Sequence, residues 1–304
     1  MTTRQKLTLH VLGIATLLIL ACGLGAPATT FPEAPTFLET QVAGTMQALT
    51  AAAPPATEIP ATDPPGPHGI PVSFQNVSFV IPEGLALGAT GEIIPASLEE
   101  TGAPWEVGPE HIRFSFSGYD NSLGKFSNVE IRVNPVLDDA GNEWMGNSLN
   151  DLRAILASPN APIAPRDMPK VPYFNAGQMF ASQIKLVNFQ GGSGVRAVTQ
   201  YGQAVGPVNN NGTFYLFVGL TSDGKHYITV VLPIGASFLP DDYDSTQPAP
   251  PNAIPFPDYA TASEAEFEAY YQAVTDQINA AAPEDFTPNL SQLDALVQSI
   301  TIIP

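Results

Sequence analysis

The sequence predicts an α+β domain, with a largely antiparallel sheet flanked by helices. Segments of alternating polar and apolar residues follow one another between residues 72 and 135. Four apolar strand candidates then lie in close succession between residues 183 and 234. Helical periodicity occurs once between these groups and twice at the C-terminal end. Strands in runs, with helices at few places, are typical of α+β folds rather than doubly wound ones.

The N-terminal residues 1–21 have the layout of a secretory signal. Arg4 and Lys6 precede an apolar run over residues 7–20, which is shorter than the roughly 20 residues that span a bilayer comfortably. A plain N-terminal anchor helix is the alternative. Cys22 follows the run and is the only cysteine in the chain, which excludes an intrachain disulfide.

The stretch ILAC at residues 19–22 resembles the lipobox of bacterial lipoproteins. This resemblance implies thioether lipidation of Cys22, cleavage before it, and acylation of the new N-terminus. Several acyl chains on one residue anchor a protein stably, whereas one chain binds only marginally. We therefore expect a lipid-anchored protein of the cell envelope, on the outer face of the cytoplasmic membrane or on the outer membrane.

Residues 22–70 read as a spacer, and residues 71–304 as a single α+β domain. The spacer is rich in Pro, Ala and Thr, as in AAAPPATEIPATDPPGPHG, and proline favours extended backbone without hydrogen-bond donors. The remaining residues are enough for one substantial domain with its own core.

Acidic residues dominate the chain, and the basic residues are confined to its middle. The formal net charge is −18, and loss of Arg4 and Lys6 with the signal would make it −20. Nine bases lie in residues 113–225, whereas residues 22–112 and 226–304 contain no Lys or Arg. Nucleic-acid binding needs clustered bases, so we expect no nucleic-acid partner. Anionic lipid headgroups would also repel the chain, and the membrane partner is expected to be reached through the acyl anchor.

Three segments in the first half of the domain read as strands. VSFQNVSFVIP (72–82) is expected to form a strand pair or a bent strand. HIRFSFSG (111–118) alternates, with Ile112, Phe114 and Phe116 on one face and polar residues on the other. VEIRVNP (129–135) repeats this alternation.

A short helix and four strands are expected next. SLNDLRAILASP (148–159) reads as a helix capped by Ser148. The strand candidates are QIKLVNFQ, GVRAVTQYG, TFYLFVGL and HYITVVLPI, and Asp223-Gly224 predicts a hairpin between the last two. TFYLFVGL (213–220) is apolar on both faces, which predicts a central strand covered on both sides.

Two helices close the domain. Residues 261–283 carry a core-facing apolar stripe, and Ser263 with Glu266 predicts a capping box at its start. NLSQLDALVQSITII (289–303) supplies the second helix and a β-branched tail.

The order of these elements, from VEIRVNP to LVQSITI, is similar to that of the PsbP-like group of α/β/α sandwiches. This resemblance implies a sandwich with the sheet between helices. The stretches GSGVRAVTQYGQ and FYLFVGLTSDGKHYITVVLPI also resemble those of uncharacterised bacterial envelope lipoproteins, a likeness that implies a family but no activity.

The residues that usually carry catalysis are sparse. His111 and His226 are the only histidines in the expected domain, and both stand at predicted strand starts. GGSGV is not a G-x-S-x-G nucleophile elbow, and neither a P-loop nor a dinucleotide-binding fingerprint occurs. No catalytic residue, cofactor or metal is therefore predicted. Calcium stays open at the acidic segments 137–143 and 240–245, although neither has EF-hand spacing.

Arg196, Gln200 and Lys185 are the candidate ligand-binding residues. GVRAVTQYG sets Arg196 and Gln200 on one strand face, and Lys185 lies on the preceding strand. A small anion or acidic partner should bind in the basic middle segment, because the flanks would repel it. The alternative is a structural ion pair or a solvated sheet edge at Arg196.

Taken together, these features predict a lipid-anchored extracytoplasmic protein with a non-catalytic binding or accessory domain. Its partner would be an unknown protein or small molecule. The alternative is an envelope hydrolase whose site is assembled from residues distant in sequence. A closed cleft that joins His111 or His226 to an ionised carboxylate would favour the hydrolase, and a polar sheet face would favour the binding protein.

Overall fold

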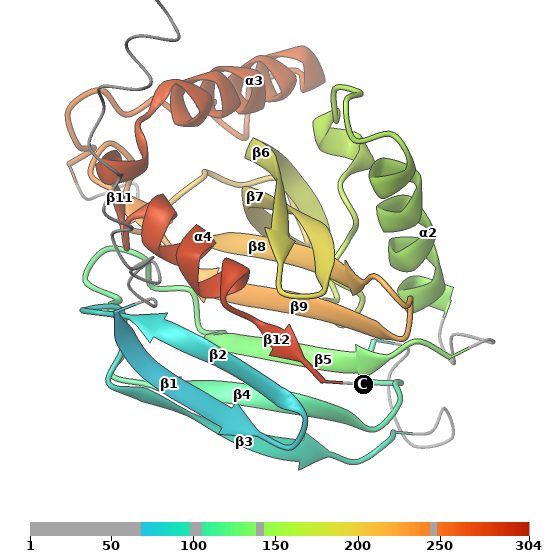
Figure 1. Cartoon of the computed structure of the whole chain (residues 1–304). Coiled ribbons are helices and arrows are strands. Elements are labelled where there is room, and N and C mark those ends of the chain that lie inside the picture. The colour runs from blue at the N-terminus through green and yellow to red at the C-terminus, as the bar shows by residue number, and fades with distance from the viewer. Residues whose placement is uncertain (1–67, 98–104, 138–142, 244–247, 304) are drawn as a thin grey trace, which may run out of the picture. The chain divides into compact units, whose positions relative to one another are not determined.

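A computed structural model describes residues 68–97, 105–137, 143–243 and 248–303 (Figure 1). Its helices are α2 (Glu143–Ala157), α3 (Glu264–Ala280) and α4 (Leu290–Gln298). The strands are β1 (Gly69–Phe74), β2 (Val77–Pro82), β3 (Gly88–Ile94), β4 (His111–Ser117), β5 (Glu130–Pro135), β6 (Gly177–Phe189), β7 (Gly192–Gly202), β8 (Thr213–Thr221), β9 (His226–Pro233), β10 (Gly235–Ala236), β11 (Phe286–Thr287) and β12 (Thr301–Ile302). Short 3₁₀ turns occur at Pro165–Asp167 and Pro283–Asp285. Cys22 and its surroundings lie outside the described residues.

A seven-stranded antiparallel sheet is the centre of the fold. Its strand order is β3-β4-β5-β9-β8-β7-β6. A second sheet has the order β1-β2-β12, and a two-stranded ladder joins β10 to β11. The α+β class and the largely antiparallel sheet flanked by helices are therefore confirmed.

The two faces of the large sheet are covered by different elements. Helix α2 packs on one face, where Leu149 and Leu152 join a buried cluster with side chains of β7, β8 and β9. Helices α3 and α4 and the β1–β2 hairpin cover the opposite face. Figure 1 shows α2 standing apart from α3 and α4, with the large sheet between them. The sheet is thus buried on both sides along its centre.

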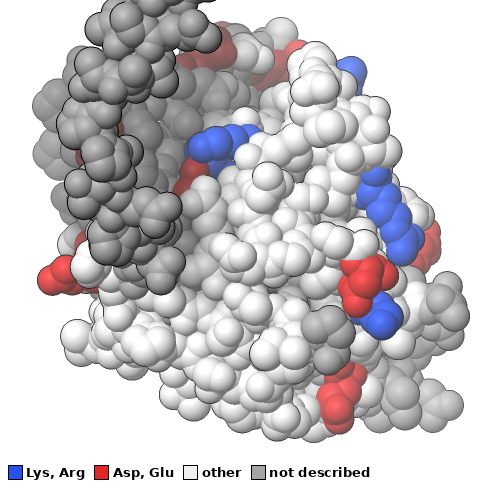
Figure 2. Space-filling view, viewed as in Figure 1, with Lys and Arg blue, Asp and Glu red and all other residues white. Residues whose placement is uncertain are grey.

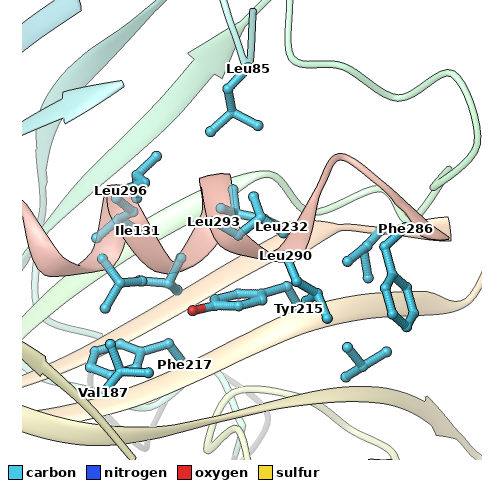
Figure 3. Close-up of a cluster of buried hydrophobic side chains, with 14 of the residues drawn as sticks. Leu85, Ile131, Val187, Tyr215, Phe217, Leu232, Phe286, Leu290, Leu293 and Leu296 are labelled. Carbon is cyan, nitrogen blue, oxygen red and sulfur yellow. The ribbon is translucent and has the colours of Figure 1, made fainter. Parts of the chain in front are cut away.

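Helix α4 supplies much of the core on its face of the sheet. Leu290, Leu293 and Leu296 recur at spacings of three, which puts them on one stripe of the helix. Figure 3 shows these side chains lying over Tyr215 and Phe217 of β8. All five are fully buried, and each such side chain contributes about 1.5–3 kcal/mol relative to leaving it exposed.

Strand β8 is central, as its sequence predicts. It pairs with β7 on one side and β9 on the other. Leu216 is buried on the α2 side and Phe217 on the α4 side, so the strand is covered on both faces. The predicted β8–β9 hairpin is also confirmed, and Gly224 occupies its turn with a φ of +73°.

The expected helix over 148–159 begins earlier than the sequence interpretation placed it. Helix α2 starts at Glu143, so Ser148 lies inside the helix and is not its cap. The Ser148 hydroxyl donates to the carbonyl of Lys170 at 2.6 Å and lies 2.7 Å from the Tyr227 hydroxyl. Ser148 therefore contacts a buried hydroxyl of the sheet and does not cap the end of the helix.

The structure also tests the predictions for the α3 capping box, the first strand segment and the C-terminal tail. The capping box of α3 is confirmed, because Ser263 accepts from the Glu266 amide and the Glu266 carboxylate accepts from the Ser263 amide. The first segment forms the β1–β2 hairpin, and the β-branched tail ends in β12. Strand β3 was not predicted.

Among the residues that the structure describes, no helix has the length and apolar character needed to cross a bilayer.

Candidate ligand-binding site

Arg196 and Lys185 lie together in the structure and share one carboxylate. They are directly opposite each other in the β6–β7 ladder. The Arg196 Nε donates to Asp294 Oδ1 of α4 at 3.2 Å, and the Lys185 Nζ lies 3.5 Å from Asp294 Oδ2. The hydroxyl of Tyr215 donates to the same carboxylate at 3.0 Å. Arg196 is only 5% exposed, so this ion pair is buried between sheet and helix.

Gln200 belongs to a separate network four residues along β7. Its Nε2 donates to the carbonyl of Pro207 at 3.0 Å, and its Oε1 accepts from the amide of Asn209 at 3.1 Å. It is completely buried. The side chain therefore ties the segment after β7 back to the strand, and the structure does not bring it to the carboxylate of Asp294.

The polar groups of this predicted site are largely engaged within the domain. Besides Asp294, the Arg196 guanidinium donates through Nη1 to the backbone carbonyl of Gln183. A ligand role for Arg196, Gln200 and Lys185 stays a prediction. What the geometry shows is an ion pair that holds α4 on the sheet, which is the alternative interpretation of Arg196.

The acidic segments also bear on a metal site. Asp138, Asp139 and Asp244 lie outside the described residues. Among the residues the structure describes, no three His, Cys, Asp or Glu side chains gather as a metal would require. Calcium at these segments stays untested.

A polar pocket of about 350 Å³ lies against β4 and β5, beside the start of α2. Its wall from the sheet is made by His111, Arg113, Arg132 and Asn134. The loop residues that precede β4, the start of α2 and the segment before β6 complete it through Trp105, Glu106, Pro109, Met145 and Tyr173. Pockets of this size take small ligands.

The strand register explains why four polar side chains face this pocket. Arg113 lies directly opposite Arg132 in the β4–β5 ladder, and the same register sets His111 opposite Asn134. Residues opposite each other point to the same face, and residues two apart on a strand share it as well. The alternating apolar residues of β4 and β5 turn to the other face, where Phe114 and Ile131 are fully buried.

Each arginine of the pair has a carboxylate neighbour, which offsets the repulsion between like charges directly opposite each other. The Arg113 guanidinium donates to Glu92 of β3 at 2.8 and 3.1 Å. The Arg132 Nη2 lies 3.0 Å from Glu130, which is itself buried. Glu106 also lines the pocket, so the site contains bases and an acid rather than bases alone.

The Arg132 guanidinium has two close neighbours, and one of its N–H donors has no partner among the described residues. Its side chain is 18% exposed, and its guanidinium carbon lies 3.6 Å from the centre of the Tyr173 ring. This stacking and the Glu130 contact fix the plane of the guanidinium. The Nε–H is buried without a hydrogen-bond partner among the described residues. A buried donor without a partner costs free energy, which a ligand acceptor would recover.

His111 and Asn134 also present polar atoms without partners. The Nδ1 of His111 lies 3.0 Å from the carbonyl of Pro109, whereas its Nε2 is buried and unpaired in the part of the chain described. Burial lowers the pKa of His111, with Arg132 and Arg113 acting in the same direction. Asn134 is 3% exposed, and its Nδ2 is the third such atom. Three polar atoms that have no partner among the described residues therefore belong to side chains that line one pocket.

Sequence reasoning assigned these residues only to the polar sides of strands. The alternation in HIRFSFSG places Arg113 on a polar face, but periodicity does not reveal which strand lies beside it. The register that pairs β4 with β5 brings the polar residues together. The one available signal was the position of Arg113 and Arg132 in the base-containing segment 113–225.

A larger cleft of about 1000 Å³ lies beside the segment 240–259. Prolines and aromatic side chains make about half of its wall, and Tyr243 and Tyr259 are exposed there. Its carboxylates have local contacts, since Asp241 lies 3.8 Å from Lys125 and Asp258 accepts from the amide of Ala260. The cleft is thus larger than the pocket at β4 and β5, but fewer of its described polar groups lack a hydrogen-bond partner.

Charged side chains are sparse on the face drawn in Figure 2. The described Lys and Arg residues on this face are separated by uncharged surface, and several stand next to Asp or Glu. Charge on this face therefore acts at individual positions.

No protein-family model, curated protein or solved structure matches this chain.

Proposed function

We propose that the chain is a lipid-anchored extracytoplasmic protein whose domain binds a small carboxylate in the pocket at β4 and β5. The observation that carries this proposal is a set of three buried polar atoms, on residues that line the pocket, that have no partner among the described residues: Arg132 Nε, Asn134 Nδ2 and His111 Nε2. Native proteins satisfy nearly all such atoms, so their presence in one cavity is best explained by a ligand that completes them.

The donors of the pocket suit a carboxylate. The Nε–H of Arg132 and the amide of Asn134 both donate, and they come from neighbouring positions on one face of β5. A charge-assisted hydrogen bond from guanidinium to carboxylate is roughly twice as strong as a neutral one. The ring of Tyr173 holds the guanidinium in place before the ligand arrives, which reduces the ordering cost of binding.

The membrane address is part of the same proposal. It is supported by the apolar run over residues 7–20, the lipobox-like ILAC stretch and the single Cys22. A domain on a proline-rich spacer would meet its ligand outside the cytoplasmic membrane, either as a receptor or as an accessory protein.

The hydrolase alternative has less support. A histidine that acts as general base needs its Nδ1 oriented, usually by a carboxylate, and a nucleophile within hydrogen-bond reach of Nε2. The Nδ1 of His111 faces the carbonyl of Pro109, and its Nε2 has no hydroxyl partner among the described residues. His226 does not line this pocket.

Thermal unfolding in the presence of small acids tests the binding function. We expect phenylacetate to raise the melting temperature of the wild type, because ligand that binds only the folded state stabilises it. Arg132→Gln should weaken the affinity by about tenfold or more, since it removes a charge-assisted hydrogen bond. Arg166→Gln is the matched control, because that side chain is 89% exposed and does not line the pocket.

Loss of Arg132 also leaves Glu130 without its ion-pair partner, so a second variant is needed. Asn134→Leu removes the other donor with little change in shape and leaves both charges in place. We expect it to lower the affinity for phenylacetate as well. Equal stabilisation of the wild type and both pocket variants would contradict the assignment of this pocket, and so would a wild type that no small acid stabilises.

A further inference from the structure

The hydrogen bond at Pro109 determines which tautomer of His111 is present. A backbone carbonyl can only accept, so the Nδ1 that lies 3.0 Å from the Pro109 oxygen must carry a hydrogen. In the neutral ring, the other nitrogen is then an acceptor. The buried Nε2 of His111, which has no partner among the described residues, is therefore an acceptor on a side chain that lines the pocket.

The surroundings of His111 keep the ring neutral. Burial disfavours the charged form, and the two arginines on this sheet face do the same, whereas Glu130 and the Pro109 carbonyl act against them. Glu106 is the remaining charged group that lines the pocket. The net direction is a pKa below the ordinary value, so the acceptor character of Nε2 persists at neutral pH.

The acceptor and the two donors belong to neighbouring side chains in one wall of the pocket. The ladder register sets His111 opposite Asn134, and side chains opposite each other have Cβ atoms about 4.5–5.5 Å apart. Arg132 is two residues from Asn134 on the same face of β5, which is about 7 Å along the strand. A ligand that satisfies all three atoms must therefore pair an anionic acceptor with a neighbouring hydrogen-bond donor.

We infer that the pocket recognises a 2-hydroxycarboxylate, whose carboxylate is held by Arg132 and Asn134 and whose hydroxyl donates to Nε2 of His111. This inference rests on the proposed binding function and makes His111 the residue that sets specificity. The hydroxyl next to the carboxylate supplies the one donor that the pocket lacks. A site built to accept a ligand hydroxyl discriminates strongly against the analogue without it, because the buried acceptor is then left unpaired.

The rest of the pocket favours an apolar substituent on this acid. Ile94, Trp105 and Met145 line it beside the polar wall. An aromatic or branched apolar group would contact these side chains and exclude water from the hydrogen bonds. Mandelate and phenylacetate are therefore suitable probes, since they share a phenyl ring and a carboxylate and differ only in the hydroxyl.

Isothermal titration calorimetry with these two probes tests the inference. We expect the preferred enantiomer of mandelate to bind the wild type about tenfold more tightly than phenylacetate, which is the effect of one hydrogen bond to a buried acceptor. In His111→Phe, which keeps a planar ring but lacks the acceptor, the two acids should bind equally.

The possible outcomes separate this inference from the binding function. Equal affinity of the wild type for both acids would overturn the hydroxyl specificity and leave carboxylate binding intact. A preference for mandelate that survives in His111→Phe would overturn the role of His111. Binding of neither acid to the wild type would contradict the proposed function itself. The wild-type comparison decides the specificity even where the variant does not fold.

Discussion

At the scale of single residues, the molecule contains two kinds of buried charge. Arg196 meets Asp294 across the sheet–helix boundary, and its Nε and Nη1 both have acceptors. Arg132 has a carboxylate and an aromatic ring beside it, yet its Nε has no partner in the part of the chain that the structure describes. The first arrangement is complete without a ligand and the second is not. This difference separates a structural ion pair from a binding site.

The Arg196–Asp294 pair yields a stability prediction. Asp294→Asn should lower the free energy of unfolding by about 3–5 kcal/mol, because it leaves the buried guanidinium without its counter-charge. The double variant Asp294→Asn with Arg196→Met should recover part of the loss. Urea denaturation measures both, with Asp241→Asn as an exposed control. An effect of Asp294→Asn no larger than that of the control would contradict a structural role.

His111 yields a prediction of pH dependence. Its pKa lies below the ordinary 6.5, chiefly because burial disfavours the charged ring. Just below that value the unfolded chain binds a proton that the folded protein does not, so the free energy of unfolding falls as the pH drops. His111→Phe lacks this contribution. The stability advantage of the wild type over this variant should therefore shrink between about pH 7 and about pH 5. An advantage that stays constant or grows would show that His111 titrates differently.

At the scale of elements, the sequence predicts the strands that have a recognisable pattern of apolar residues. It does not predict a strand that forms only because of packing against neighbouring strands. β4, β5 and β8 follow from alternation or from a doubly apolar run. β3 contains Gly88 and Gly91 in seven residues, and glycine is depleted in strands. A side chain at Gly91 would collide with Phe74, so this strand depends on close packing against β1.

The sequence likewise predicts only part of the candidate site. Alternation in β4 and β5 predicts which residues are polar-facing, but the pairing of β4 with β5 decides which of them meet. The position of Pro109 opposite the His111 ring and of Tyr173 beneath Arg132 depends on loops that periodicity does not describe. The sequence makes Arg196 a candidate ligand-binding residue because it lies in a segment that clearly predicts a strand. Its partner Asp294 is 98 residues away, on a helix whose docking the sequence does not reveal.

The central position of β8 is tested by truncation. Leu216→Ala should lower the free energy of unfolding by about 2–5 kcal/mol, because a cavity is left on the α2 side of a doubly covered strand. Leu87 is 80% exposed, and Leu87→Ala serves as the control with a change expected within about 0.5 kcal/mol. Similar losses for the two variants would mean that the face at Leu216 is not tightly packed.

At the scale of the whole molecule, the proposed function combines a lipid anchor, a spacer and a binding domain. The domain residues that the structure describes form a large sheet with a buried cluster on each face, and the polar pocket lies against β4 and β5. Residues 1–67 lie outside the described part, so lipidation and the spacer stay predictions from sequence.

The anchor is tested by metabolic labelling in a bacterial host. Cys22→Ser should abolish incorporation of labelled palmitate and leave unprocessed precursor, because the thiol is the expected acceptor of the lipid. A conservative change at Gly23 to Ser should leave labelling intact and controls for expression. Normal labelling of Cys22→Ser would end the lipoprotein interpretation.

The central claim is that a carboxylate occupies the pocket between β4 and β5. A crystal structure of the domain grown with 4-bromophenylacetate tests it most directly, because bromine gives an anomalous signal that locates the ligand. We expect the bromine beside Trp105 and Met145, with the carboxylate within hydrogen-bond distance of Arg132 Nε and Asn134 Nδ2. An ordered ligand elsewhere with this pocket empty, or the pocket filled only by water at saturating ligand, would contradict the account.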